Sequence, residues 1–205
     1  PLGTANDFNV MAGLPPTIAE AARIIAQGQT RQIDAVQVAG AFFINNSGLA
    51  MEPMVTIENI RMKRLSGEVR YFVALIKVIA KMKAWHMQVR WDDGQYEGPV
   101  YLLYVCNSPR TGGFTMAPGA EIDDGRFDVV LAPEVPKLTL LNLLLRLMRG
   151  THVQHDRVTF VRSTHLSVNS QPGTPLHTDG EVISESLSAV EYQMLPGKLT
   201  LLTPA

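Results

Sequence analysis

The chain of 205 residues is 46% hydrophobic and 18% charged, which suits one globular domain or slightly more and excludes disorder over most of its length. Its formal net charge of -1 gives no basic excess for neutralising phosphates, so we expect no nucleic-acid partner. The single cysteine, Cys106, excludes an internal disulfide, and a cytoplasmic location is the expectation.

A polar turn and a helix are predicted at the start of the sequence. The opening stretch PLGTANDF contains glycine and polar residues of the kind that join two regular elements. Thr17 and Glu20 have the spacing of a capping box. Ile18 and Ile25 fall on one helical face, and Gly28 is a stop signal. These signals predict a helix that begins after Thr17 and ends at Gly28.

Two strands and a second helix are predicted next. From Ile33 the chain is rich in valine and aromatic residues in loose alternation, which predicts two short strands with a turn near Gly40. This change of pattern places a domain boundary near Arg31. An apolar stripe along residues 67–85 then predicts a helix.

Three later stretches have β patterns. Alternating apolar residues lead into Asp93 and Gly94, a dipeptide that favours a primed hairpin turn. Residues 155–170 alternate over their whole length. A final stretch is predicted to turn at Pro196 and Gly197 between two strands.

The helix predicted over residues 136–151 is apolar on nearly every side except at Arg146 and Arg149, and it ends at Gly150. Such a helix is either deeply buried or rests against an apolar surface. It is too short to span a bilayer, which needs about 20 apolar residues.

Two acidic clusters could carry chemistry or could be simple turns. Asn6 and Asp7 either cap the opening turn with their own side chains or belong to a functional loop. Asp123 and Asp124 precede Gly125, which is typical of a hairpin turn. The same carboxylates and turn carbonyls would also supply the oxygen ligands that Mg²⁺ or Ca²⁺ prefers.

A third acidic cluster surrounds Gly180 and contains His177, Asp179 and Glu181. In an extended segment the two carboxylates, two positions apart, would project to the same face. Paired carboxylates at one point suit proton abstraction, metal binding, or both. The alternative is an Asp-Gly turn followed by a solvated glutamate.

The order of five short motifs resembles that of the diacylglycerol kinase catalytic family, which includes sphingosine kinases, ceramide kinases and several bacterial lipid kinases. The motifs are GTANDF, INNSGLAMEP, KRLSGEVRYFVALI, APGAEIDDGRFDV and HTDGE, and the resemblance runs from Pro1 almost to Ala205. It implies an α+β, β-rich fold: the C-terminal β-sandwich substrate domain of a two-domain lipid kinase, with a remnant of the α/β nucleotide domain.

The resemblance also implies a division of the chain. Residues 1–32 would be the remnant of the nucleotide-binding domain, residues 33–195 the β-sandwich substrate and catalytic domain, and residues 196–205 a C-terminal strand that returns to the nucleotide domain. The family's GGDGT loop, which precedes its GTxND motif, does not occur in the sequence. We therefore expect this chain alone to fold but to lack kinase activity and ATP binding.

The resemblance assigns two groups of residues to nucleotide and catalysis. Thr4, Asn6 and Asp7 match positions on the nucleotide side. Asp179 and Glu181 match the catalytic carboxylates, and which of them is the base stays open. Phosphoryl transfer to an alcohol needs such a carboxylate to accept the hydroxyl proton.

A structural Mg²⁺ site is implied in the IDDG stretch. Asp124 matches a side-chain ligand of the ion, and the backbone carbonyls of Glu121 and Arg126 match its companion ligands.

The implied function is ATP-dependent phosphorylation of a lipid hydroxyl, with Mg²⁺ and ATP as cofactors. The lipid would be diacylglycerol, a sphingoid base or a related alcohol, reached by transient peripheral association with a membrane, and a homodimer is left open. The main alternative is a non-catalytic lipid-binding or regulatory module of the same fold. An NAD kinase, whose fold is related, is disfavoured by the order of the GTAND and DGE motifs.

Overall fold

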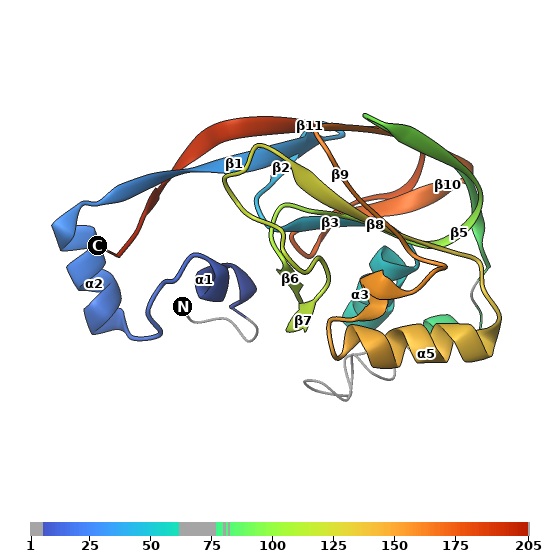
Figure 1. Cartoon of the computed structure of the whole chain (residues 1–205), viewed down its shortest axis with the longest axis horizontal. Coiled ribbons are helices and arrows are strands. Elements are labelled where there is room, and N and C mark those ends of the chain that lie inside the picture. The colour runs from blue at the N-terminus through green and yellow to red at the C-terminus, as the bar shows by residue number, and fades with distance from the viewer. Residues whose placement is uncertain (1–5, 62–76, 80, 82, 205) are drawn as a thin grey trace.

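A strongly curved β-sheet dominates the fold (Figure 1). The computed structural model describes residues 6–61, 77–79, 81 and 83–204. Within these residues one nine-stranded sheet has the order β2-β1-β11-β10-β3-β5-β8-β9, with β4 paired to both β10 and β5, and β6 and β7 form a separate two-stranded sheet. The prediction of a β-rich, sandwich-like chain is confirmed.

The elements have the following bounds along the chain. The strands of the large sheet are β1 (Thr30–Val38), β2 (Ala41–Phe43), β3 (Asn46–Ala50), β4 (Trp85–Trp91), β5 (Gly94–Cys106), β8 (Phe127–Pro133), β9 (Thr159–Ser163), β10 (His165–Thr178) and β11 (Glu181–Leu202). The small sheet consists of β6 (Arg110–Thr111) and β7 (Phe114–Thr115). The helices are α1 (Asp7–Met11), α2 (Ile18–Gln27), α3 (Met51–Arg61), α5 (Lys137–Leu147) and the 3₁₀ helix η1 (His152–Gln154).

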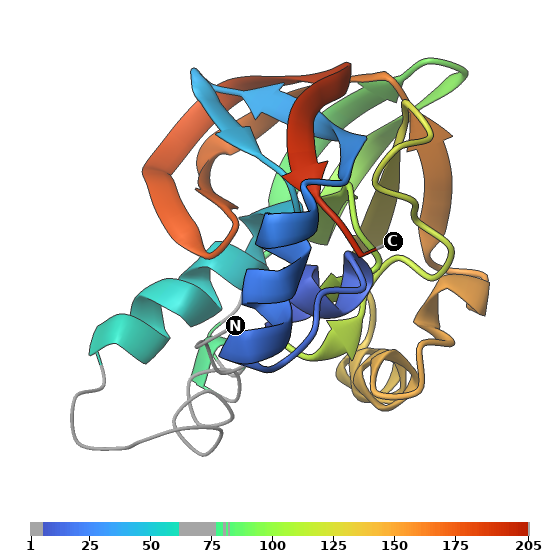
Figure 2. The same ribbon diagram turned by 90° about the vertical axis from the view of Figure 1, so that its left-hand side faces the viewer.

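The hydrophobic core lies inside the curve of the sheet. Strand β10 bends so that its first part pairs with β4 and its last part with β3. Side chains from most strands meet in this core, and they include Val36, Leu49, Val89, Leu103, Leu131, Leu166, Leu176 and Tyr192. The helices lie on one side of the sheet, as Figures 1 and 2 both show. The turns that join strands on this side of the sheet therefore lie closest to the helices.

Helix α2 is confirmed together with its predicted caps. The Thr17 hydroxyl accepts the N–H of Glu20 at 3.3 Å and donates to its carboxylate at 2.6 Å. Gly28 ends the helix with a φ of 67°. Ile24 is buried, whereas the predicted apolar face with Ile18 and Ile25 is exposed.

Two predicted hairpins are confirmed, one with a shifted turn. Ala39 and Gly40 join β1 to β2 and have φ of 47° and 78°, as a primed two-residue turn requires. The β4–β5 hairpin turns at Asp92 and Asp93 rather than at Asp93 and Gly94, because Gly94 already pairs with the last residue of β4.

The alternating stretch of residues 155–170 forms two strands instead of one. Strand β9 ends at Ser163 and β10 begins at His165, so Thr164 interrupts the β structure. The Asp92 carboxylate accepts the backbone N–H groups of Thr164 at 2.7 Å and of His165 at 3.2 Å. These hydrogen bonds from a distant carboxylate stabilise the interruption between the two strands. The local alternation of apolar residues therefore could not predict it.

The predicted turn at Pro196 and Gly197 is wrong. Strand β11 runs on without reversal, and its register with β1 shifts at this point, which is a β-bulge. Proline has no N–H for the ladder, and the Gly197 N–H donates to the Asp34 carboxylate at 2.7 Å instead of to a strand partner. The chain therefore bulges where a turn was expected.

Helix α5 confirms the predicted apolar helix, with one face buried and another exposed. The helix predicted over residues 67–85 lies largely outside the described residues; of its length, residues 77–79 and 81 are described and helical, whereas Trp85 already begins β4. Among the described helices, none is both long enough and apolar enough to cross a bilayer.

Candidate functional site

The acidic turn after β10 is a tight turn. Asp179 and Gly180 have φ of 47° and 87°, and Thr178 of β10 pairs with Glu181 of β11 across them. Of the two interpretations of this segment, the structure shows the Asp-Gly turn, because Asp and Gly tolerate positive φ and form a two-residue turn. The extended arrangement with both carboxylates on one face does not occur.

The Asp179 carboxylate is surrounded by backbone N–H groups of the loop between β2 and β3. One oxygen accepts from Asn45 at 3.0 Å and Asn46 at 2.9 Å, and the other accepts from Ile44 at 3.1 Å. The N–H of Asp179 donates to the Asn46 carbonyl at 2.8 Å. Glu181 lies at the start of β11, and both side chains are exposed. Asp179 is thus distinguished by its backbone hydrogen bonds and not by burial.

The same β2–β3 loop is bound to the segment that follows β5. The Asn45 carbonyl accepts the N–H groups of Asn107 at 2.9 Å and Ser108 at 3.1 Å. The Ser108 hydroxyl donates to the Asn45 side-chain oxygen. The Asn107 side-chain amide donates to the Ile44 carbonyl at 2.9 Å. Asn107 and Ser108 are buried, so these contacts are shielded from water.

The opening segment joins this network through Asp7. The carboxylate is buried, lies 3.4 Å from the Arg110 Nε and accepts the N–H of Gly113 at 3.1 Å. The Ser108 hydroxyl also lies 3.5 Å from the Arg110 carbonyl. A continuous set of contacts therefore links Asp7, in the GTAND motif, with Asp179, in the HTDGE motif.

The three predicted nucleotide-side residues differ in what the structure describes. Asn6 precedes α1 with a left-handed backbone, φ 50°, and Asp7 is the first residue of that helix. Thr4 lies outside the described residues. The contacts of Asp7 are with the β6–β7 hairpin, which the sequence did not indicate as part of a site.

A buried His–Glu pair supports the Asp-Gly turn. The N–H of Gly180 donates to the His177 Nδ1 at 3.3 Å, and the His177 Nε2 contacts the Glu52 carboxylate. A Cβ on Gly48 would lie 2.5 Å from the same Nε2, so glycine is required there. The sequence placed His177 in the acidic cluster and Glu52 in the INNSGLAMEP motif but did not pair the two; Glu52 reaches His177 from α3.

The loop before β8 contains the predicted Mg²⁺ ligands. One Asp124 oxygen accepts the N–H of Arg126 at 3.0 Å, and the other lies 3.6 Å from the Arg162 guanidinium. Glu121 belongs to the same loop and is exposed. Over the part of the chain that the structure describes, no group of three or more His, Cys, Asp and Glu side chains is arranged to hold a metal ion. The predicted set, one carboxylate with two carbonyls, is an all-oxygen set that suits Mg²⁺, and it stays a prediction.

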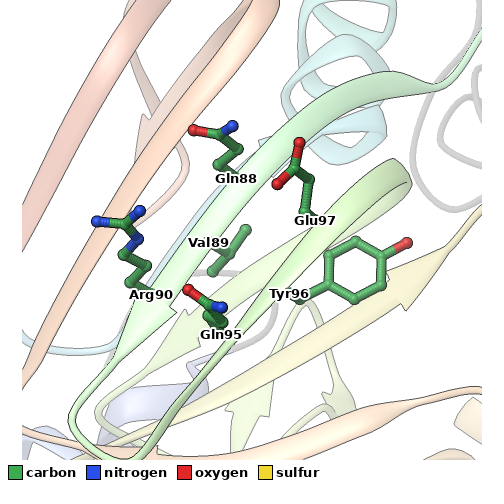
Figure 3. A pocket seen from close by; sticks show the side chains of 6 residues that line it. All are labelled: Gln88, Val89, Arg90, Gln95, Tyr96 and Glu97. Carbon is green, nitrogen blue, oxygen red and sulfur yellow. The ribbon is translucent and has the colours of Figure 1, made fainter.

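Two surface hollows are lined by residues outside this network. One, of about 170 Å³, lies on the β4–β5 hairpin, where Figure 3 shows the side chains that line it: Gln88, Val89, Arg90, Gln95, Tyr96 and Glu97. The other, of about 610 Å³, lies beside α3 and residues 77–85, and its lining includes Met54, Lys81 and Trp85. Neither lining contains a predicted site residue.

The curved sheet, with a polar network of turns at one side, defines a β-sandwich-like domain. Comparison with known families gives the same class of domain. A family model described as the YegS C-terminal NAD kinase beta sandwich-like domain matches residues 46–203, and the diacylglycerol kinase catalytic domain matches residues 1–38. The chain therefore belongs to the diacylglycerol kinase catalytic-domain family, of which it comprises the C-terminal β-sandwich domain and the tail of the catalytic domain.

The relatives that the chain resembles are distant in sequence and close in fold. The diacylglycerol kinase of Bacillus subtilis is 26% identical over 184 residues, which cover 88% of this chain and 61% of the relative. That of Staphylococcus saprophyticus is 27% identical over 183 residues, covering 88% and 60%. A solved diacylglycerol kinase-like protein from Bacillus anthracis gives a TM-score of 0.79 at 22% identity and covers 100% of this chain and 68% of that one. The chain thus spans about 60% of the length of these curated relatives.

Proposed function

We propose that the chain is the lipid-substrate part of an ATP-dependent lipid kinase that transfers the γ-phosphate to a lipid hydroxyl. The observation that carries this proposal is the contact network that runs from Asp179 through Asn45 and Ser108 to Arg110 and Asp7. It brings the motif expected on the nucleotide side and the motif expected to perform the chemistry to one side of the molecule. Diacylglycerol is the first substrate to assay, because the curated relatives are diacylglycerol kinases.

The two carboxylates of the turn receive different roles. Asp179 accepts three backbone N–H groups, which engages its oxygens and fixes the turn, so we assign it as a positioning residue. Glu181 is exposed one residue beyond the turn. It is therefore our candidate for the base that accepts the proton of the attacking hydroxyl.

ATP and Mg²⁺ are the cofactors that such a reaction requires, and the Mg²⁺ would neutralise charge on the transferred phosphate. We place Thr4 and Asn6 on the nucleotide side. Asp7 is engaged by Arg110 and Gly113, so we assign it to holding the β6–β7 hairpin beside the nucleotide. A second, structural Mg²⁺ is proposed at Asp124 with the carbonyls of Glu121 and Arg126.

A lipid kinase assay tests the proposed base. The protein assayed needs a nucleotide loop of the GGDGT type, because that sequence does not occur among the 205 residues. Glu181→Gln is expected to lower kcat by roughly 10²- to 10⁴-fold, the usual contribution of a general base. Glu185→Gln, a matched change at another exposed position of β11, should turn over at the wild-type rate. Equal rates for the two variants would contradict the assignment.

The alternative, a non-catalytic lipid-binding or regulatory module, makes a different prediction for the same assay. Such a protein would bind lipid vesicles but would phosphorylate none of diacylglycerol, sphingosine and ceramide in the presence of MgATP. Turnover of any one of these lipids by the wild-type protein favours the kinase.

A further inference from the structure

Helix α5 exposes a row of apolar side chains. Leu138, Leu141, Leu145 and Met148 recur at helical spacing, so they form one stripe along the helix. Their exposed fractions are 83%, 55%, 53% and 71%. These four lie within residues 138–148, whereas the three exposed large hydrophobic side chains of β11 are spread over its 22 residues. This stripe is the feature on which the inference rests, and we call it the α5 stripe.

The opposite face of α5 is fixed to the body of the protein. Leu140 and Leu143 are buried in a cluster with Val135, and Ile79 and Tyr101 pack against that cluster. Folding therefore uses one apolar face of the helix and leaves the α5 stripe in water. A helix that needs only one apolar face for its core normally carries polar residues on the other, so the stripe calls for an apolar partner.

The charged residues within α5 and just after it are all cations. Residues 137–155 contain Lys137, Arg146 and Arg149 and no aspartate or glutamate. The whole chain, in contrast, has 19 acidic against 18 basic residues. An apolar stripe with an exposed cation near each end, Lys137 and Arg149, is complementary to a surface that is apolar beneath and negatively charged above, which is the interface of an anionic bilayer.

We propose that the α5 stripe docks on the surface of an anionic phospholipid bilayer, with the helix lying in the plane of the interface. The proposal deepens the proposed function and rests on it, because a kinase of membrane lipids must meet its substrate at such a surface. A helix of 11 residues is too short to span a bilayer but long enough to lie along one.

The docking surface is connected to the candidate site through the C-terminal end of α5. Gly150, just after the helix, lies beside Thr115 of β7, and the His152 Nε2 is 2.9 Å from the Met116 carbonyl. Strand β7 pairs with β6, where Arg110 contacts Asp7. Figure 1 shows the same order, with the end of α5 next to the β6–β7 hairpin. Docking of α5 would therefore bring the candidate site close to the lipid surface.

Vesicle flotation of the 205-residue protein tests the docking. We expect binding to mixed phosphatidylglycerol and phosphatidylcholine vesicles and much weaker binding to phosphatidylcholine alone. Leu141→Glu should weaken binding by at least about tenfold, because it places a charge in the apolar contact. Lys137→Gln and Arg149→Gln should each weaken it by roughly fivefold, which corresponds to about 1 kcal/mol per cation.

The matched control is Ile25→Glu, the same kind of change at an exposed isoleucine of α2. Helix α2 lies at the opposite end of the molecule from α5 in Figure 1, so this variant should bind vesicles as the wild type does. The substituted positions are all exposed, and circular dichroism checks that each variant is folded. Equal flotation of wild type and Leu141→Glu overturns the proposal.

A label on the α5 stripe separates a membrane from a second copy of the chain. Cys106 is buried, so Met148→Cys can be labelled selectively with an environment-sensitive dye. If the stripe docks on lipid, the emission shifts to the blue only with anionic vesicles and is quenched by brominated lipid. If the dye is shielded without vesicles and Leu141→Glu converts a dimer to a monomer in sedimentation, the stripe is a dimer interface and the proposal is overturned.

Failure of the docking and failure of the kinase are distinguishable, because vesicle binding needs neither ATP nor turnover. In a protein that carries the nucleotide loop, Leu141→Glu should keep the wild-type rate on a dispersed short-chain diacylglycerol. It should lose at least about tenfold on vesicle-embedded substrate, in step with the lost binding. Equal losses on both substrates would contradict the docking role of Leu141.

Discussion

At the scale of single residues, aspartates tie the turns of this protein to one another. Asp34 accepts the N–H groups of Gly125 and Gly197, both at 2.7 Å. Asp92 binds the backbone between β9 and β10, and Asp179 binds the β2–β3 loop. Each supplies an acceptor for backbone donors that a turn leaves without a ladder partner. The hydrogen bonds of these aspartates therefore explain their positions structurally, and a chemical role for any of them needs separate support.

The first prediction separates the two carboxylates of the HTDGE turn by stability. Asp179→Asn should lower the free energy of unfolding by about 0.5–1.5 kcal/mol, because an amide group cannot accept all three N–H groups and at least one hydrogen bond is lost. Glu181→Gln is at an exposed position and should change it by no more than about 0.5 kcal/mol. Urea unfolding of the two variants measures both values. Similar losses for both would mean that Glu181 also supports the fold.

The second prediction concerns the pH dependence of stability at Asp128. Burial raises the pKa of the Asp128 carboxyl to about 6, and the charge of Arg162, whose Nε lies 3.3 Å away, offsets this only in part. The unfolded value is about 3.9, so between about pH 4 and pH 6 the folded state binds the proton more strongly. This group therefore stabilises the protein below about pH 4, and that contribution is lost as the pH rises to about 6.

Asp128→Asn removes this titration. The difference in unfolding free energy, wild type minus variant, should fall by roughly 2–3 kcal/mol between about pH 4 and pH 7. Urea unfolding at a series of pH values measures it, and the subtraction cancels the other titrating groups. A difference that does not change with pH would show that the carboxyl titrates at its ordinary value.

At the scale of elements, the sequence predicted those whose signals are local. Thr17, Glu20 and Gly28 carry the start and end of α2 in their own residue types, and α2 forms as expected. The bulge at Pro196 and the break at Thr164 were not predictable, because each depends on a carboxylate from a distant part of the chain.

The candidate site shows the same limit. The positions of its acidic turns could be predicted, because Asp and Gly mark turns in any sequence. The contribution of Asn45, Ser108 and Arg110 could not, because each acts through a partner on another element. Of the two geometries considered for Asp179 and Glu181, the turn forms for a local reason, the preference of Asp-Gly for positive φ.

The third prediction belongs to the loop before β8. If Asp124 ligates Mg²⁺ with the carbonyls of Glu121 and Arg126, EDTA should lower the melting temperature of the wild type, because the ion stabilises the folded loop by binding to it. Asp124→Ala should melt lower than the wild type in Mg²⁺ and should not respond to EDTA. Asp123→Ala is the control, since the Asp123 carboxylate pairs with Arg31 at 2.8 Å and is not in the predicted ligand set. An unchanged EDTA response in Asp124→Ala would exclude this site.

At the scale of the whole molecule, the end of β11 pairs with the start of β1. Strand β1 pairs with β11 from Thr30, opposite Leu202, and the Thr203 N–H donates to the Gln29 carbonyl at 3.0 Å. The domain divisions predicted after residues 32 and 195 both fall within this strand pair and stay a prediction.

The last prediction uses Cys106 as a probe of the whole core. Cys106 is buried in β5 between Asn46 of β3 and Asp128 of β8. Burial, with a smaller contribution from the charge of Asp128, raises the pKa of its thiol, and the thiolate is the reactive form. A thiol reagent such as DTNB should therefore react only after the core opens, with a rate that follows the global free energy of unfolding across a urea series. Met148→Cys supplies the control, because the second thiol lies on the exposed α5 stripe and should react at once in native buffer. Reaction of Cys106 at that same fast rate without urea would mean that β5 opens independently of the rest of the sheet, contrary to a single cooperative core.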